Sequence, residues 1–71
     1  MQAELVERLS SRFSDAQVDV QVDGNRASIT VLSSEFDGLS RVKKQQAVYA
    51  CIEDYIADGR LHAVTIKADA S

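Results

Sequence analysis

The longest helical pattern in the chain, over residues 40–57, constrains the fold more than any other feature. Its apolar residues recur at i, i+3, i+4, i+7 and i+8, which places them on one helix face; they are Val48, Cys51, Ile52, Tyr55 and Ile56. The Ser40 hydroxyl can cap the first turn. Asp58-Gly59 can end the helix, because glycine tolerates the left-handed conformation found just past a helix end. The spacing predicts one amphipathic helix that buries this face against another layer.

Two patterns of different period precede this helix. Residues 2–13 have helical spacing, with one apolar face made of Leu5, Val6, Leu9 and Phe13. Residues 17–23 and 26–33 alternate apolar and polar side chains, which is typical of half-buried strands. Asp23-Gly24-Asn25 between them favours a tight turn. The first half of the chain therefore predicts a helix followed by an antiparallel hairpin with one wet face.

The remaining segments complete one small domain. Residues 34–39 are expected to form a loop, residues 61–68 a third strand, and residues 69–71 a frayed tail. The predicted order is helix, strand, strand, helix, strand. For a chain of 71 residues we expect a single domain, 1–71, of the α/β (α+β) class. Its three-stranded sheet carries the helices on one face.

Composition excludes several classes of function. The net charge of −3 argues against bulk non-specific nucleic-acid binding, which needs an excess of Lys and Arg. No apolar run approaches the ~18 residues that a membrane-spanning helix needs, and the N-terminus does not have the pattern of a signal peptide. The single Cys51 forms no internal disulfide, so a reducing cytoplasm is the simplest compartment. In so short a chain, any chemical site is expected to be shared with a partner.

His62, the only histidine, is the first candidate for chemistry. It stands at the predicted start of the third strand, where a metal or a partner could reach the imidazole. In the predicted strand it falls on the same face as Val64 and Ile66. A partly buried core histidine with one hydrogen bond is therefore the alternative. A lone histidine carries no ligand spacing that would decide between the two interpretations.

Other polar groups are weaker candidates. Cys51 falls on the apolar helix face, where free cysteine usually packs as a small hydrophobe. Arg41, Lys43 and Lys44 cluster at a helix start and suit either phosphate or acidic-partner binding or a solvated face; no aromatic residue is interleaved with them for base stacking. The carboxylates of Glu35, Asp37, Glu53 and Asp54 are expected to be solvated. No nucleophile elbow, phosphate-binding glycine loop or zinc spacing occurs.

The amino-acid sequence of the central stretch resembles the BolA family. The segments that carry the likeness are Phe36-Asp37-Gly38-Leu39-Ser40-Arg41-Val42-Lys43-Lys44-Gln45-Gln46, Val48-Tyr49, Tyr55-Ile56-Ala57-Asp58 and Arg60-Leu61-His62-Ala63-Val64. The Arg-Val-Lys-Lys-Gln-Gln run looks most like the family's IbaG branch. The likeness is close over residues 36–68 and extends to the first half in pattern only. It implies a fold like that of class II KH domains, with Gly38-Leu39-Ser40-Arg41 where those domains carry a Gly-x-x-Gly loop.

The resemblance implies a non-enzymatic partner of a monothiol glutaredoxin, with which family members share a two-iron, two-sulfur cluster. The family's ligand histidine corresponds to His62. A second ligand usually comes from the loop between the first two strands, which here reads Asp23-Gly24-Asn25-Arg26, with Arg26 where the IbaG branch carries a histidine. The chain alone is expected to hold no cofactor.

The family implies a second role in stress-linked transcription. In that role Ser40, Arg41, Lys43 and Lys44 would contact DNA. A third possibility is a protein-interaction module that binds another partner through its exposed helix surface. We expect no membrane and no small-molecule substrate for this protein.

Overall fold

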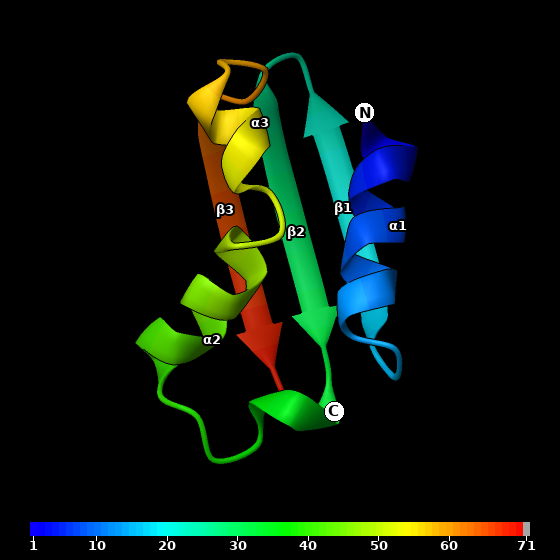
Figure 1. The fold of residues 1–71 in the computed structure, drawn as a ribbon, viewed down its shortest axis with the longest axis vertical. Helices are drawn as coiled ribbons and strands as arrows, with labels where there is room; N and C mark the ends of the chain where they lie inside the picture. The colour runs from blue at the N-terminus through cyan, green and yellow to red at the C-terminus, as the bar shows by residue number, and fades with distance from the viewer. Residues whose placement is uncertain (71) are drawn as a thin grey trace.

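A three-stranded sheet forms one layer of the molecule. The computed structural model describes residues 1–70, with strands β1 (Gln17–Asp23), β2 (Arg26–Leu32) and β3 (Ala63–Asp69). They lie in the order β1-β2-β3; β1 and β2 are antiparallel, and β2 and β3 are parallel (Figure 1). The parallel pair needs a long crossover, and the helices between β2 and β3 provide it.

The helices form the second layer, on one face of the sheet. They are α1 (Gln2–Arg12), α2 (Arg41–Tyr49) and α3 (Glu53–Ala57), and a 3₁₀ turn η1 (Ser34–Phe36) joins β2 to α2 (Figure 1). The buried core fills the space between the layers and consists of Leu5, Leu9, Phe13, Val20, Ala27, Ile29, Val31, Phe36, Val48, Ile52, Tyr55 and Leu61. The predicted three-stranded sheet with helices on one face is confirmed.

The hairpin forms as its alternation predicts. Val20 pairs with Ile29, and both side chains are buried beneath the helices. Gly24 adopts a φ of 61° in the connecting turn, a conformation that glycine accepts without a Cβ clash. The predicted strand 26–33 ends one residue early, at Leu32. Ser33 caps η1 and donates its hydroxyl to Asp15 Oδ1 at 2.8 Å.

The single helix predicted over residues 40–57 is wrong, because the chain breaks into α2 and α3. At the break, Cys51 N–H donates to Val48 O at 3.1 Å and Ile52 N–H to Tyr49 O at 3.0 Å, so the bonds span three residues instead of four. Arg8 Nη1 donates to the Cys51 carbonyl at 3.3 Å, while Tyr55 N–H bonds to Ile52 O. A side chain from α1 thus takes the carbonyl that a continuous helix would use internally.

The third strand begins at Ala63, and the predicted start at Leu61 is wrong. Leu61 N–H donates to Tyr55 O at 3.0 Å and closes the end of α3, so Leu61 turns into the core before the strand starts. The tail predicted to fray is ordered through Asp69, whose carbonyl accepts from Ser33 N–H at 3.0 Å. Ser71 lies outside the described residues.

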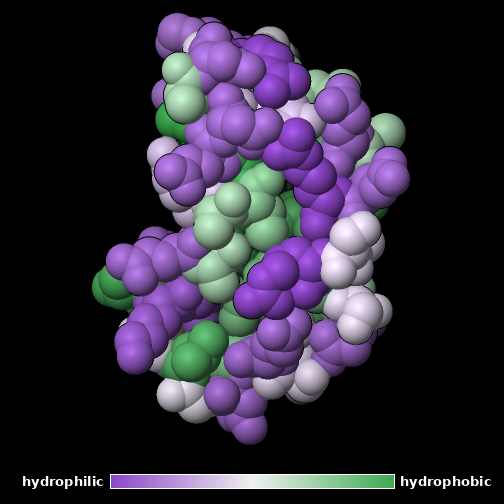
Figure 2. All heavy atoms as spheres, in the orientation of Figure 1, coloured by the Kyte–Doolittle hydropathy of each residue, from purple (hydrophilic) through white to green (hydrophobic). Residues whose placement is uncertain are grey.

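Hydrophilic side chains cover most of the helical face of the molecule, and hydrophobic ones break through over α2 (Figure 2). The exposed large apolar residues include Leu39, Val42 and Tyr49, which lie in α2 or just before it. Among residues 1–70, no helix has both the length and the apolar character needed to cross a bilayer.

Candidate functional site

His62 lies exposed at the corner where the chain enters β3, beside the β1–β2 turn. Its backbone N–H donates to the carbonyl of Asn25, the turn residue, at 2.8 Å. The imidazole Nε2 lies 3.9 Å from the position that a Cβ on Gly59 would occupy. The alternative of a partly buried core histidine is wrong, because His62 precedes the strand and its side chain remains outside the core.

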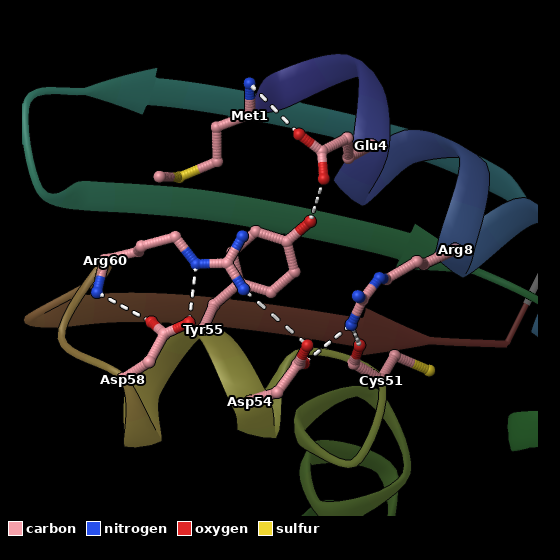
Figure 3. Close-up of polar contacts among 8 residues, drawn as sticks. All are labelled: Met1, Glu4, Arg8, Cys51, Asp54, Tyr55, Asp58 and Arg60. Atoms are coloured by element: carbon pink, nitrogen blue, oxygen red, sulfur yellow. Dashed lines mark hydrogen bonds and ion pairs between the residues drawn. The ribbon is translucent and has the colours of Figure 1, made fainter.

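The residues around His62 fix its backbone on two sides. Leu61 is buried and bonded to α3, and His62 itself is bonded to the β1–β2 turn. Arg60 stacks its guanidinium 3.9 Å from the centre of the Tyr55 ring, and its Nε donates to Asp58 Oδ2 at 2.8 Å (Figure 3). The imidazole is therefore presented to solvent from a segment whose position is set by its neighbours.

Tyr55 connects this segment to α1. Its ring is fully buried, and its hydroxyl donates to Glu4 Oε2 at 2.7 Å, which holds the pKa of Glu4 below its ordinary value (Figure 3). Arg8 lies 4.6 Å from the ring centre and donates to Asp54 Oδ1 at 2.6 Å, which lowers the pKa of Asp54. Both carboxylates therefore stay ionised to lower pH than usual, and these contacts tie α3 to α1.

The chain supplies one suitable cluster ligand at this corner, the His62 imidazole. Iron–sulfur clusters favour thiolate or imidazole ligands, and the adjacent turn offers Asn25 and Arg26 instead. Within residues 1–70, no group of three or more His, Cys, Asp or Glu side chains comes together in an arrangement that could hold a metal. At this corner the chain could give an iron–sulfur cluster one ligand, the His62 imidazole. Most of the ligands would have to come from a partner.

Cys51 does not complete the corner. It lies in the break between α2 and α3, is partly buried, and lines a hollow with α1 residues such as Arg8 and Arg12. Burial raises the pKa of its thiol, and the Sγ–H donates to Ala47 O at 3.7 Å. As expected, it packs against the core, although it is only partly buried. A raised pKa lowers the thiolate fraction and with it the reactivity.

The predicted basic cluster is placed at the start of α2, as its position in the sequence indicated. Ser40 caps the helix, since its hydroxyl oxygen accepts from Lys43 N–H at 3.3 Å. Arg41 and Lys43 are exposed. Lys44 turns toward the sheet, where its Nζ lies 3.7 Å from Asp69 Oδ1 and its side chain is 20% exposed. Part of the positive charge is therefore compensated within the chain.

Sequence reasoning missed two residues of this surface. Lys67 lies with Arg41 and Lys44 around a hollow at the C-terminal end of β3, and β2–β3 pairing brings it there. Tyr49 is 40% exposed and lines the neighbouring groove together with Arg41. The spacing of Arg41, Gln45 and Tyr49 at four-residue intervals was the available signal.

The structure separates the two candidate sites. His62 precedes β3, whereas Lys44 and Lys67 lie near its far end. A strand rises about 3.3 Å per residue, so the seven residues of β3 place the two sites roughly 20 Å apart. In Figure 1 the orange segment that leads into β3 lies at the top of the view, and the start of α2 lies at the bottom. A partner that uses one site alone leaves the other accessible.

Comparison with known proteins gives a consistent result. The sequence model of the family described as BolA-like protein matches residues 15–71. Acid stress protein IbaG of Escherichia coli is 48% identical over 60 residues, which cover 84% of this chain and 71% of the relative. BolA1 from Arabidopsis thaliana superposes with a TM-score of 0.86 at 20% identity, over 97% of this chain and 89% of that one. The BolA domain of SufE1 from the same plant gives 0.84 at 22% identity, over 97% and 90%.

Proposed function

This chain belongs to the BolA-like protein family, and from that premise we propose that it is a non-enzymatic partner of a monothiol glutaredoxin in iron–sulfur cluster handling. His62 is the ligand that this chain contributes. The observation that carries the proposal is the exposed imidazole on a backbone bonded to both α3 and the β1–β2 turn. A relative named for acid stress is compatible with such a role.

Because this corner offers a single suitable ligand, the partner would supply the other cluster ligands. Glutaredoxin and glutathione thiolates would hold one iron, and His62 would contribute to the other. A positioned imidazole needs little reorganisation to meet a cluster, because Leu61 and Asn25 already hold the adjacent backbone. This chain therefore acts by presenting one side chain, while the partner provides most of the binding.

The test is an anaerobic titration of a cluster-loaded monothiol glutaredoxin with this protein, followed by visible circular dichroism. We expect a new cluster spectrum with the native chain and none with His62→Ala. Lys43→Ala, an exposed change at the far end of the molecule, is the matched control and should behave like the native chain. Unchanged spectra with the native protein would sink the proposal.

Arg26→His sharpens the same experiment. It places an imidazole at the β2 position that pairs with Ala63, next to His62. We expect this variant to retain the cluster longer than the native chain during challenge with a chelator. If retention falls below that of the native chain, the β1–β2 turn does not face the cluster.

We propose DNA binding by a stress regulator as the second candidate, supported by the cations around the end of β3. Arg41, Lys44 and Lys67 line one hollow there, with Lys43 exposed nearby and Ser40 engaged as the helix cap. Fluorescence anisotropy with duplex DNA over a salt series tests it, because each neutralised phosphate adds to the salt slope. Arg41→Ala should reduce the slope, whereas Arg26→Ala, which removes an exposed cation at the other end of β3, should not.

A further inference from the structure

The outer edge of β3 is open. Within the described sheet β3 pairs only with β2. Ala63 N–H bonds to Asn25 O and Asp69 O accepts from Ser33 N–H, so these odd-numbered residues direct their backbone groups toward β2. Because backbone groups alternate along a strand, the N–H and C=O groups of Val64, Ile66 and Ala68 point away from β2. That edge offers a row of hydrogen-bonding groups to a further strand.

A groove of about 670 Å³ runs between this edge and α2, and it exposes apolar side chains. Val64 and Ile66 face the helical layer but are only partly buried. On the helix side, Tyr49 is 40% exposed, and Val42 is 62% exposed, the most exposed of the large apolar residues. The sheet edge and the helix thus leave contiguous apolar surface uncovered.

The charges along the groove are arranged with opposite signs at its two ends. Arg41, Gln45, Tyr49 and Glu53 follow one another at four-residue spacing, and all line the groove. Arg41 stands at one end and Glu53 at the other, and within residues 1–70 neither forms an ion pair. A copy of the same row placed antiparallel meets Arg41 with Glu53 and Gln45 with Tyr49. The row is therefore complementary to itself, which neither an acidic peptide nor a phosphate backbone would match.

We propose that this face binds a second copy of the chain, with β3 pairing antiparallel to β3 about a two-fold axis at Ile66. In this register Val64 lies opposite Ala68, so the residues with outward backbone groups meet one another. The axis is perpendicular to the sheet and keeps both α2 helices on the same side, where Val42 and Tyr49 become covered. The contact is isologous and closes at two copies, so it does not propagate into a fibre.

This interface is separate from the His62 corner. His62 precedes β3 and does not line the groove. Loss of the dimer would therefore leave cluster sharing through His62 untouched, and loss of cluster sharing would leave the dimer untouched.

Sedimentation velocity over a dilution series tests the proposal. We expect the mass of the native protein to move from that of one chain to that of two as concentration rises. Arg41→Glu and Glu53→Arg should each raise the dissociation constant roughly tenfold or more, because each puts like charges at both ends of the contact. The double variant should regain most of the affinity. Lys43→Glu, the same charge reversal outside the groove, should have little effect.

Hydrogen exchange gives the second readout. The amides of Val64, Ile66 and Ala68 should gain protection as the dimer forms. A one-chain mass at every concentration would overturn the proposal, as would a dimer that the double variant fails to restore. Protection of these amides only on adding DNA or glutaredoxin would also overturn it and would assign the groove to that partner.

Discussion

The two ends of the helical layer cover the same sheet in different ways. At the α1–α3 end, Tyr55 is fully buried, the guanidiniums of Arg8 and Arg60 lie against its ring, and its hydroxyl donates to Glu4 (Figure 3). At the α2 end, Val48 is the only buried residue of the helix, and Val42 and Tyr49 remain exposed. The difference teaches that the fold is secured from α1 and α3, while α2 retains surface for partners.

Truncation of one tyrosine at each end should show the largest difference in unfolding free energy between the two ends. Tyr55→Ala removes a buried ring from the core and should cost about 3–5 kcal/mol of unfolding free energy. Tyr49→Ala removes a ring that is 40% exposed and should cost less than about 1 kcal/mol. Urea unfolding followed by far-ultraviolet circular dichroism measures both. Equal losses at the two sites would show that α2 secures the fold as firmly as α3.

A smaller change isolates the hydrogen bond within the α1–α3 end. Tyr55→Phe keeps the ring but removes the hydroxyl that donates to Glu4, and should cost about 1 kcal/mol. The same urea experiment measures it. A neutral result would assign the stabilisation to ring packing and arginine stacking alone.

Part of the acid response should arise at the same end. Tyr55 holds the pKa of Glu4 below its ordinary value of 4.5, so ionised Glu4 stabilises the native state at pH values above that. This contribution is lost as pH falls through the lowered native pKa. Thermal unfolding between pH 5 and pH 3, measured for the native chain and for Tyr55→Phe, should show a shallower acid loss in the variant. Parallel curves would contradict the assignment.

The smallest expected effect on stability belongs to His62. Its side chain is exposed, so His62→Ala should change the unfolding free energy by no more than about 0.5 kcal/mol. Urea unfolding of this variant separates ligation from folding. A large loss would mean that the imidazole supports the corner, and that any loss of cluster in this variant is indirect.

The sequence predicts the layers well but not the helix break. Alternation in residues 17–23 and helical spacing in residues 2–13 are local patterns, and the structure follows both closely. Residues 40–57 contain no proline and no glycine, since Gly38 and Gly59 lie outside this range. Their apolar spacing is continuous. At the break, Arg8 reaches the Cys51 carbonyl, 43 residues away along the chain. No local pattern encodes that contact.

The candidate sites were partly predictable for the same reason. The Ser40 cap and the exposed Arg41 and Lys43 follow from residues close in sequence. The position of His62 depends on Asn25 O and on the bond from Leu61 to α3, which come from other elements. Lys67 joins Arg41 and Lys44 only because β3 packs beside α2. Contacts between distant segments therefore decided what the sequence left open.

The most direct test of the central claim uses the fact that His62 is the only histidine in this chain. The protein is labelled with ¹⁵N-histidine and mixed anaerobically with a cluster-loaded, unlabelled monothiol glutaredoxin. The cluster is then reduced and examined by pulsed electron paramagnetic resonance for nitrogen coupling. We predict a strong ¹⁵N coupling that is absent when His62→Ala is used. A cluster signal in the mixed sample without ¹⁵N coupling would contradict ligation by His62.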